Sequence, residues 1–129
     1  EKVLSSLREH TTAQLWCVFG CGGDRDKGKR PMMGEIAMRL ADKVVITADN
    51  PRSEQVNVIM SEIVAGIAAH QHSYLQIADR KQAIEYALSQ AQIGDLVLVA
   101  GKGHEDYQEI QGVRYLFDDA AIVSAFLEK

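Results

Sequence analysis

The sequence has no continuous apolar run approaching the roughly 18 residues that a transmembrane helix needs, and this absence excludes such a helix. Cysteine is also scarce, with Cys17 and Cys21 as the only two among 129 residues. A zinc site would need further ligands at matching spacing, and the four histidines are scattered along the chain. We therefore expect no metal site in this chain, a reduced and buried Cys17 thiol, and a cytoplasmic location.

Basic side chains are outnumbered as well. Lys and Arg total 14 against 18 Asp and Glu, which gives a formal net charge of −4. A surface that binds duplex DNA carries an excess of basic side chains, so we expect no nucleic-acid partner. The opening stretch EKVLSSLREH is polar and charged, unlike a secretory signal, and we expect no membrane partner. The length suits one domain with a substantial core.

Four short apolar runs have the composition of buried strands, and they alternate with segments of helical periodicity. The expected strands are residues 14–20, 43–48, 73–78 and 95–101. Between them, apolar residues recur three and four positions apart, as they do in amphipathic helices, and the opening stretch looks like a helix too. This alternation predicts an α/β fold with a doubly wound, mostly parallel sheet.

The last part of the chain departs from that rhythm. Residues 107–117 contain two short β-like runs around a glycine, which predicts a hairpin or an antiparallel edge strand. Asp118 follows and can cap a final helix. No repeat or interior linker interrupts the chain, so residues 1–129 are expected to form one domain.

The loop after the first expected strand nearly matches a phosphate-binding loop. Residues 23–30, GDRDKGKR, fit the pattern G-x-x-x-x-G-K-[ST] except at the last position. Arg30 stands where a hydroxyl would bind magnesium, and Asp24 and Asp26 would repel phosphate oxygens, so a nucleotide cradle is disfavoured. Two other interpretations are a turn with solvated charges and, the one we favour, a loop that presents Arg25 to an anionic ligand. The side chains that could still meet a phosphate at the loop's edge are Lys27, Lys29 and Arg30.

The loop after the second expected strand, TADNPRSE, is more specific. Pro51 fixes its own φ and restricts Asn50 to an extended conformation. Arg52 therefore projects from a stiff turn, and its planar fork suits a carboxylate, while Asp49 can accept from an ammonium. Such a turn can bind both charged groups of an amino acid. The alternative is a helix-entry turn in which Asp49 and Asn50 only satisfy local N–H groups.

A third loop, AGKGHEDYQ, follows the last expected strand. Gly101 allows the backbone to approach a ligand closely, and Glu105 is a second candidate partner for an ammonium. His104 could act as a general base, although no sequence neighbour orients it, and a structural role is the alternative. Loops after parallel strands meet at the carboxyl edge of a sheet, where α/β proteins bind ligands. We therefore expect these three loops, with the short loop at 79–80, to form one site.

The segments FGCGGDRDKGKRPMMGEIA, TADNPRSE, AGKGHEDYQ and FDD together resemble the carboxy-terminal domain of the Mur ligases. The resemblance covers nearly the whole chain, and D-N-P-R is the diaminopimelate-recognition motif of one branch of that family. It implies a Rossmann-like fold. The residues that it places on the incoming amino acid, meso-diaminopimelate, are Arg25, Asp49, Asn50, Pro51, Arg52, Gly101 and Glu105.

The resemblance also implies an activity. Such ligases use ATP and Mg²⁺ to convert the D-glutamyl carboxylate of UDP-N-acetylmuramoyl-L-alanyl-D-glutamate into an acyl phosphate, which the amine of diaminopimelate attacks during peptidoglycan synthesis. Their ATP-binding central domain and UDP-binding amino-terminal domain match no part of this sequence. We therefore expect a fragment that is inactive without its central domain. The alternatives are a relative that adds lysine or ornithine, a stand-alone small-molecule-binding module and an independent NTPase.

Overall fold

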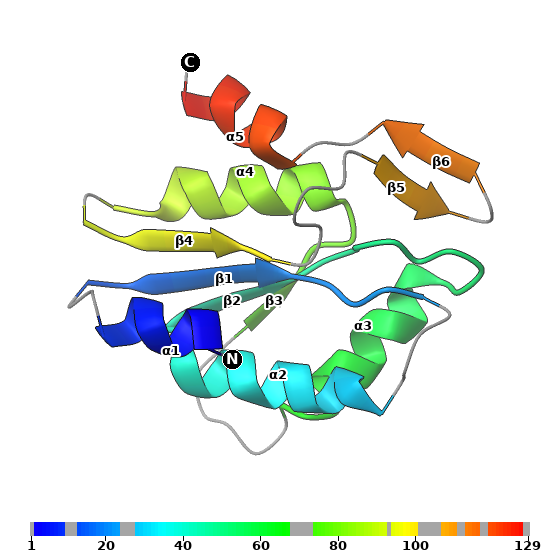
Figure 1. The fold of residues 1–129 in the computed structure, drawn as a ribbon, viewed down its shortest axis with the longest axis horizontal. Coiled ribbons are helices and arrows are strands. Elements are labelled where there is room, and N and C mark those ends of the chain that lie inside the picture. Colours follow the sequence, from blue (N-terminus) through cyan, green and yellow to red (C-terminus); the bar gives the residue numbers. More distant parts are fainter. Residues whose placement is uncertain are drawn as a thin grey trace.

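The computed structural model describes residues 2–9, 13–23, 28–67, 74–92, 94–100, 107–110, 113–116 and 119–127. Helices and strands alternate along most of these ranges (Figure 1). The elements, in chain order, are α1 (Lys2–Glu9), β1 (Leu15–Phe19), α2 (Lys29–Leu40), β2 (Lys43–Ile46), α3 (Val56–Val64), β3 (Tyr74–Gln76), α4 (Arg80–Gln90), β4 (Leu96–Val99), β5 (Tyr107–Ile110), β6 (Val113–Leu116) and α5 (Asp119–Leu127).

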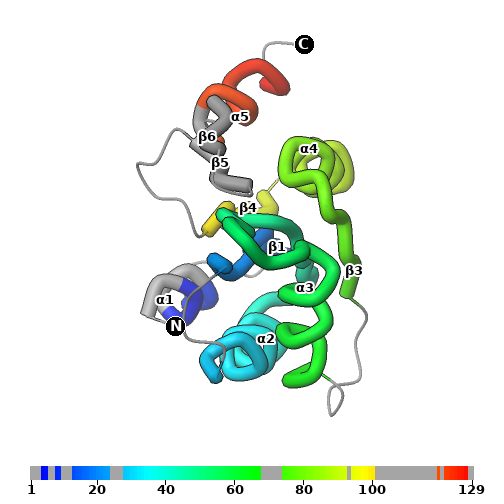
Figure 2. Tube along the Cα trace, turned by 90° about the vertical axis from the view of Figure 1, so that its right-hand side faces the viewer, coloured from blue at the N-terminus to red at the C-terminus, as the bar shows by residue number. Residues whose placement is uncertain are grey.

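The first four strands form one parallel sheet in the order β3-β2-β1-β4. Cys17 in β1 lies opposite Val44 of β2 on one side and Leu98 of β4 on the other. Helices α1, α2 and α3 lie on one face of the sheet, and α4 and α5 lie on the other (Figure 2). The predicted doubly wound α/β architecture is confirmed, because helices cover both faces of a parallel sheet.

Two hydrophobic cores fill the two sides of the sheet. Successive side chains of a strand point to opposite faces, so β1 contributes to both cores. Cys17 and Phe19 pack with α1, α2 and α3, whereas Trp16 and Val18 pack with α4 and α5. The central strand is therefore fully enclosed, which explains its uninterrupted apolar sequence.

The two outer strands are more exposed than expected. Leu75 in β3 is 41% exposed, and the residues of β4 are half-buried. Among the described strands, β3 pairs with β2 alone and β4 with β1 alone. The strands at 73–78 and 95–101 were thus predicted correctly as strands, but the prediction that they are buried was wrong because both lie at edges.

The predicted hairpin is confirmed as a separate two-stranded sheet. β5 and β6 are antiparallel, with Tyr107 opposite Leu116. α5 begins at Asp119, and its predicted cap, Asp118, lies outside the described residues. None of the helices in the described ranges has the length and apolar character needed to cross a membrane.

Candidate functional site

The direction of winding reverses beside β1. The chain moves from β1 to β2 and β3 on one side, and then returns to place β4 on the other side of β1. The loops that follow β1, β2 and β4 therefore leave three adjacent strand ends at the carboxyl edge, which faces the viewer in Figure 2. A crevice at such a reversal is the usual ligand site of an open α/β sheet.

The loop after β1 and the D-N-P-R turn are joined directly. The backbone N–H of Gly23 donates to the carbonyl oxygen of Asn50 at 2.7 Å. The contact is so close that a Cβ atom on Gly23 would lie 1.7 Å from the carbonyl oxygen of Pro51. Any larger residue at position 23 would force the two loops apart, so this glycine is needed for the approach and not for flexibility.

Arg52 reaches back across this junction. Its Nη1 donates to the carbonyl oxygens of Gly23 at 3.0 Å and Asn50 at 3.3 Å. Arg52 has a φ of 54°, in the left-handed region that a side chain with a Cβ disfavours. A residue held there costs about 1–3 kcal/mol, and such strain is concentrated at functional sites. The half-buried guanidinium is thus fixed by the fold before any ligand arrives.

The predicted site residues divide into two groups. Asp49, Asn50, Pro51 and Arg52 lie together just beyond the carboxyl end of β2, with Asn50 and Pro51 buried. The rest lie outside the described residues, so their convergence with the D-N-P-R turn stays a prediction. These residues are Arg25, Gly101, His104 and Glu105, together with Lys27 at the edge of the phosphate-like loop.

Arg30 does not face a phosphate, in contrast to one of the possibilities raised by the sequence. It is 1% exposed, and it forms a two-pronged ion pair with the Glu54 carboxylate at 3.0 and 2.9 Å. Nη1 also donates to Glu62 at 3.0 Å, and Nη2 donates to the Gly22 carbonyl at 2.9 Å. The hydrogen bond to Glu54 is the largest of the effects that raise the pKa of Arg30. Because its guanidinium is bound by two carboxylates and also donates to the Gly22 carbonyl, Arg30 holds the loop after β1 in place.

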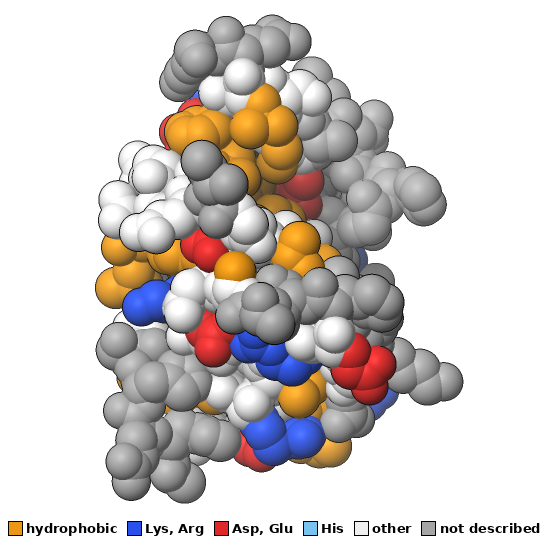
Figure 3. All heavy atoms as spheres, turned by 90° about the vertical axis from the view of Figure 1, so that its left-hand side faces the viewer, with side chains coloured by type: hydrophobic (Ala, Val, Ile, Leu, Met, Phe, Trp, Pro, Cys, Tyr) orange, Lys and Arg blue, Asp and Glu red, His pale blue; other side chains and the backbone are white. Residues whose placement is uncertain are grey.

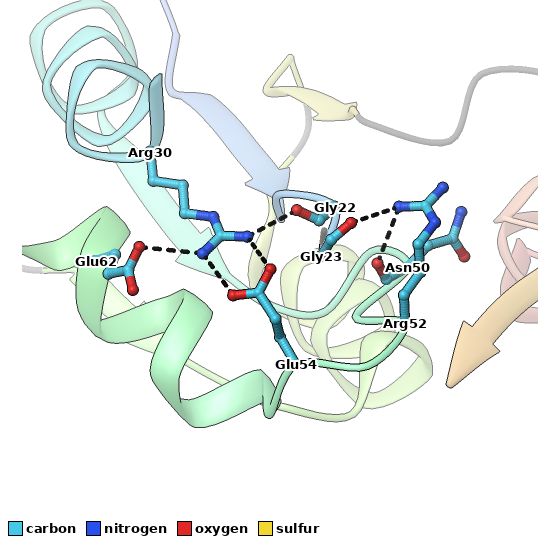
Figure 4. Close-up of polar contacts among 7 residues, drawn as sticks. All are labelled: Gly22, Gly23, Arg30, Asn50, Arg52, Glu54 and Glu62. Atoms are coloured by element: carbon cyan, nitrogen blue, oxygen red, sulfur yellow. Dashed lines mark hydrogen bonds and ion pairs between the residues drawn. The ribbon is translucent and has the colours of Figure 1, made fainter. Parts of the chain in front are cut away.

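Figure 4 shows the two arginines on opposite sides of the Gly22–Gly23 segment. Arg30 donates to the Gly22 carbonyl from the α2 side, and Arg52 donates to the Gly23 carbonyl from the other. Glu54 belongs to the stretch that follows Arg52, so Arg30 also ties the first loop to the second. The described part of the loop after β1 is therefore held from both sides.

Arg80 is a functional candidate that the sequence did not single out. It is 1% exposed and begins α4, opposite the α2 side of the sheet. Its Nε and Nη2 donate to the two oxygens of Asp119 at 2.8 and 2.7 Å. Nη1 donates to the Ala48 carbonyl at 2.9 Å, and Nη2 donates to the Ala100 carbonyl at 3.1 Å. The available signals were the position of 79–80 at the carboxyl edge and the FDD segment.

The two cysteines are protonated and buried. Burial raises the pKa of Cys17 to about 12. Burial also raises the pKa of Cys21 to about 11, opposed by the charge of Arg30 and assisted to a smaller extent by that of Asp49. A thiolate is the form that binds metals and attacks electrophiles. The expected buried thiol at Cys17 is confirmed, and the described residues include no cluster of three or more His, Cys, Asp or Glu side chains suited to a metal ion.

A sizeable hollow lies away from the D-N-P-R turn, at the amino edge of the sheet. It has a volume of about 620 Å³. Its lining includes Gln14, Trp16, Lys43, Tyr74, Tyr86 and Asp95. On the face of the molecule seen from that edge, charges of both signs are interspersed with apolar side chains, and neither sign forms a broad patch among the described residues (Figure 3). The D-N-P-R turn lies at the opposite edge of the sheet, so the volume of a hollow does not by itself identify the site.

Residues 1–103 match the family described as "Mur ligase, glutamate ligase domain". Three similar proteins bear the name UDP-N-acetylmuramoyl-L-alanyl-D-glutamate–2,6-diaminopimelate ligase. They come from Vibrio vulnificus (56% identity, 86% of this chain and 22% of the relative), Haemophilus ducreyi (50%, 100% and 26%) and Pseudomonas aeruginosa (54%, 92% and 24%).

A solved structure of a ligase with the same name superposes with a TM-score of 0.93 at 49% sequence identity. The match covers 98% of this chain and 26% of that chain. The chain thus spans about a quarter of the length of the relatives it matches. The family match covers residues 1–103, and the Haemophilus ducreyi relative is 50% identical over the whole chain. The chain therefore belongs to the Mur ligase family.

Proposed function

We propose that this chain is the amino-acid-binding domain of a ligase that adds meso-diaminopimelate to UDP-N-acetylmuramoyl-L-alanyl-D-glutamate. The observation that carries the proposal is the geometry of Arg52, which is held in a left-handed conformation and anchored to two backbone carbonyls. The relatives named for diaminopimelate support the choice of substrate. The full-length enzyme would act in the cytoplasm during peptidoglycan synthesis.

The proposed selectivity rests on one carboxylate. Diaminopimelate resembles lysine with an additional carboxylate on the far carbon. If Arg52 pairs with that carboxylate, lysine leaves a desolvated guanidinium without its ligand partner, at a cost of about 2–5 kcal/mol. That cost corresponds to a preference of roughly thirty-fold to several thousand-fold.

The remaining roles follow the charges of the ligand. Glu105 would accept from the ammonium of the distal amino-acid centre, with the Gly101 carbonyl as a second acceptor. Asp49 would add negative charge on the D-N-P-R turn, and Arg25 would bring a second guanidinium near the ligand. Binding in this way would leave one amine directed toward the activated carboxylate, and positioning of that kind can supply about 7–11 kcal/mol in favourable cases.

ATP and Mg²⁺ would be bound mainly by the central domain, outside this chain. The near match to a phosphate loop does not fit them, because Arg30 replaces the hydroxyl and is enclosed by Glu54 and Glu62. The described residues also lack a group of acidic ligands suited to Mg²⁺. The partners of the domain would be that central domain and, through the full-length enzyme, the small-molecule substrates.

The test replaces Arg52 by Ala in the full-length ligase that carries this domain. We expect kcat/KM for diaminopimelate to fall by at least about thirty-fold while the value for lysine changes far less, because only the carboxylate interaction is lost. Steady-state kinetics with each amino acid measure the ratio. Arg39→Ala is the matched control, since the Arg39 side chain is 48% exposed on α2 and forms an ion pair with Glu35, one turn earlier in the same helix. An unchanged ratio in Arg52→Ala would remove the assignment.

Titration calorimetry of the 129-residue chain separates the alternatives. Weak binding of diaminopimelate, lysine and ATP is expected from half of a shared site. Tight binding of an amino acid by the chain alone would favour a stand-alone module, and a preference for lysine would favour a lysine-adding relative. ATP hydrolysis by the chain alone would support an independent NTPase.

A further inference from the structure

Two of the three predicted recognition loops begin at residues that share one side-chain partner. Ala48 directly precedes Asp49, and Ala100 directly precedes Gly101. The Arg80 guanidinium donates to both carbonyls, from Nη1 at 2.9 Å and from Nη2 at 3.1 Å. Because β2 and β4 flank β1 on opposite sides, this one side chain spans the end of the central strand.

The same guanidinium also fixes a third element. Asp119 lies in the first turn of α5, and its two carboxylate oxygens accept hydrogen bonds from Nε and Nη2 of Arg80. The arginine side chain is 0% exposed and that of Asp119 is 16% exposed, so water competes little for these hydrogen bonds. The planar guanidinium thus donates four hydrogen bonds. All four can form together only when the ends of β2 and β4 and the start of α5 keep their relative positions.

From these contacts we infer that Arg80 is a positioning residue for amino-acid recognition. It fixes the carbonyl groups of Ala48 and Ala100, the residues that directly precede the D-N-P-R turn and the predicted loop of Gly101 and Glu105. Its two hydrogen bonds to Asp119 hold the guanidinium plane in the orientation that these carbonyls require. This inference rests on the proposed function, since it concerns the two loops that would hold the amino acid. Arg80 itself is enclosed by protein groups and would not touch the ligand.

Lysine cannot replace the fork. An ammonium is a single compact donor, and it cannot meet both Asp119 oxygens and two carbonyls on different strands. In the full-length ligase, Arg80→Lys should therefore raise KM for diaminopimelate by about ten- to hundred-fold, because small misplacements at a binding site have effects of this size. KM for ATP and for the UDP-linked dipeptide should stay within about twofold, since these groups would bind elsewhere.

A merely structural role would give a different result. If Arg80 only stabilised the fold, Arg80→Lys would lower the fraction of active enzyme, and kcat would fall with all three KM values unchanged. That outcome, or an equal rise of all three KM values, would overturn the inference. Arg39→Lys is the control on an exposed arginine of α2 and should leave every value unchanged.

Asp119→Asn keeps the inference testable if Arg80→Lys fails to fold. It removes one charge while leaving Arg80 in place, so it should raise KM for diaminopimelate selectively but less than Arg80→Lys. An unchanged KM in a folded Asp119→Asn enzyme would then decide against the inference.

Hydrogen–deuterium exchange separates this inference from the proposed function. In the 129-residue chain, Arg80→Lys should accelerate exchange in peptides that contain Ala48 and Ala100, and leave peptides of α2 unchanged. If the full-length ligase proved to use lysine or no amino acid, the proposed function would fail while this result could still stand. Unchanged exchange at both positions would overturn the inference whatever the substrate.

Discussion

The two edges of the parallel sheet satisfy their unpaired backbone groups with opposite charges. At the amino edge, Asp42 accepts from the N–H of Leu15 at 2.8 Å, and Asp95 accepts from two further backbone N–H groups at 3.1 and 2.8 Å. At the carboxyl edge, Arg30 and Arg80 donate to carbonyl oxygens of the strand ends and their loops. Buried backbone N–H and carbonyl groups need partners, and in these contacts carboxylates serve N–H groups at the amino edge while guanidinium groups serve carbonyls at the carboxyl edge.

The edges differ in burial. The Asp42 side chain is 36% exposed, and water can replace its partners, whereas the Arg80 side chain is fully enclosed. A buried ion that loses its partner costs far more than an exposed one. The edge that carries the proposed binding loops is therefore built from the interactions that are hardest to remove, while the opposite edge is held by interactions that solvent weakens.

The largest expected effect on stability is at the carboxyl edge. Replacing Arg80 by Met should lower the free energy of unfolding by about 3–5 kcal/mol, because Asp119 then keeps a charge without its cation. Urea denaturation of the 129-residue protein measures the change. Exposed ion pairs contribute about 0–1 kcal/mol. A loss below about 1 kcal/mol would therefore mean that the ion pair of Arg80 stabilises the fold no more than an exposed pair does, and that the two edges do not differ in this respect.

A smaller effect is expected from the amino edge. Asp42→Asn keeps an oxygen that can accept from Leu15 but removes the ion pair with Arg8, whose side chain is 31% exposed. We expect a loss of about 1 kcal/mol, in the range of partly exposed pairs and single hydrogen bonds. The same urea titration provides the comparison, and a loss as large as that of Arg80→Met would contradict the ranking of the edges.

The smallest effect on stability is expected from Asp95, and this effect should depend on pH. The backbone hydrogen bond from Gln92 is the largest cause that lowers the pKa of Asp95 from its ordinary value of 3.8. A lowered folded-state pKa stabilises the fold above the unfolded value and loses this contribution as pH falls through the folded value. Asp95→Asn should therefore be less stable than the parent at pH 6, and the difference should shrink below pH 3.8. Thermal melts across that range test it; a pH-independent difference would exclude the linkage.

The central part of the fold was predictable from local patterns. The enclosed strand β1 reads as an unbroken apolar run, and the period of three and four in the following segments gives the helices. The exposure of Leu75 in β3 could not be predicted, because strand order decides which runs lie at an edge and no local pattern records that order.

The D-N-P-R turn was also predictable, since proline restricts both itself and Asn50. The left-handed conformation of Arg52 was not, because it follows from contacts with Gly23 in a different loop. The ion pairs of Arg30 and Arg80 were not predictable for a similar reason. Their carboxylate partners lie 24, 32 and 39 positions away, so sequence spacing carries no sign of the pairing.

The brevity of β3 has a consequence for association between molecules. An outer strand with unpaired backbone groups invites a strand from another copy, which would extend the ladder and begin an aggregate. β3 contributes three residues, Tyr74–Gln76, to the sheet. So short a template offers an incoming strand few hydrogen bonds to offset the entropy of docking. The exposed Leu75 therefore lies on an outer strand that is too short to template the addition of further strands.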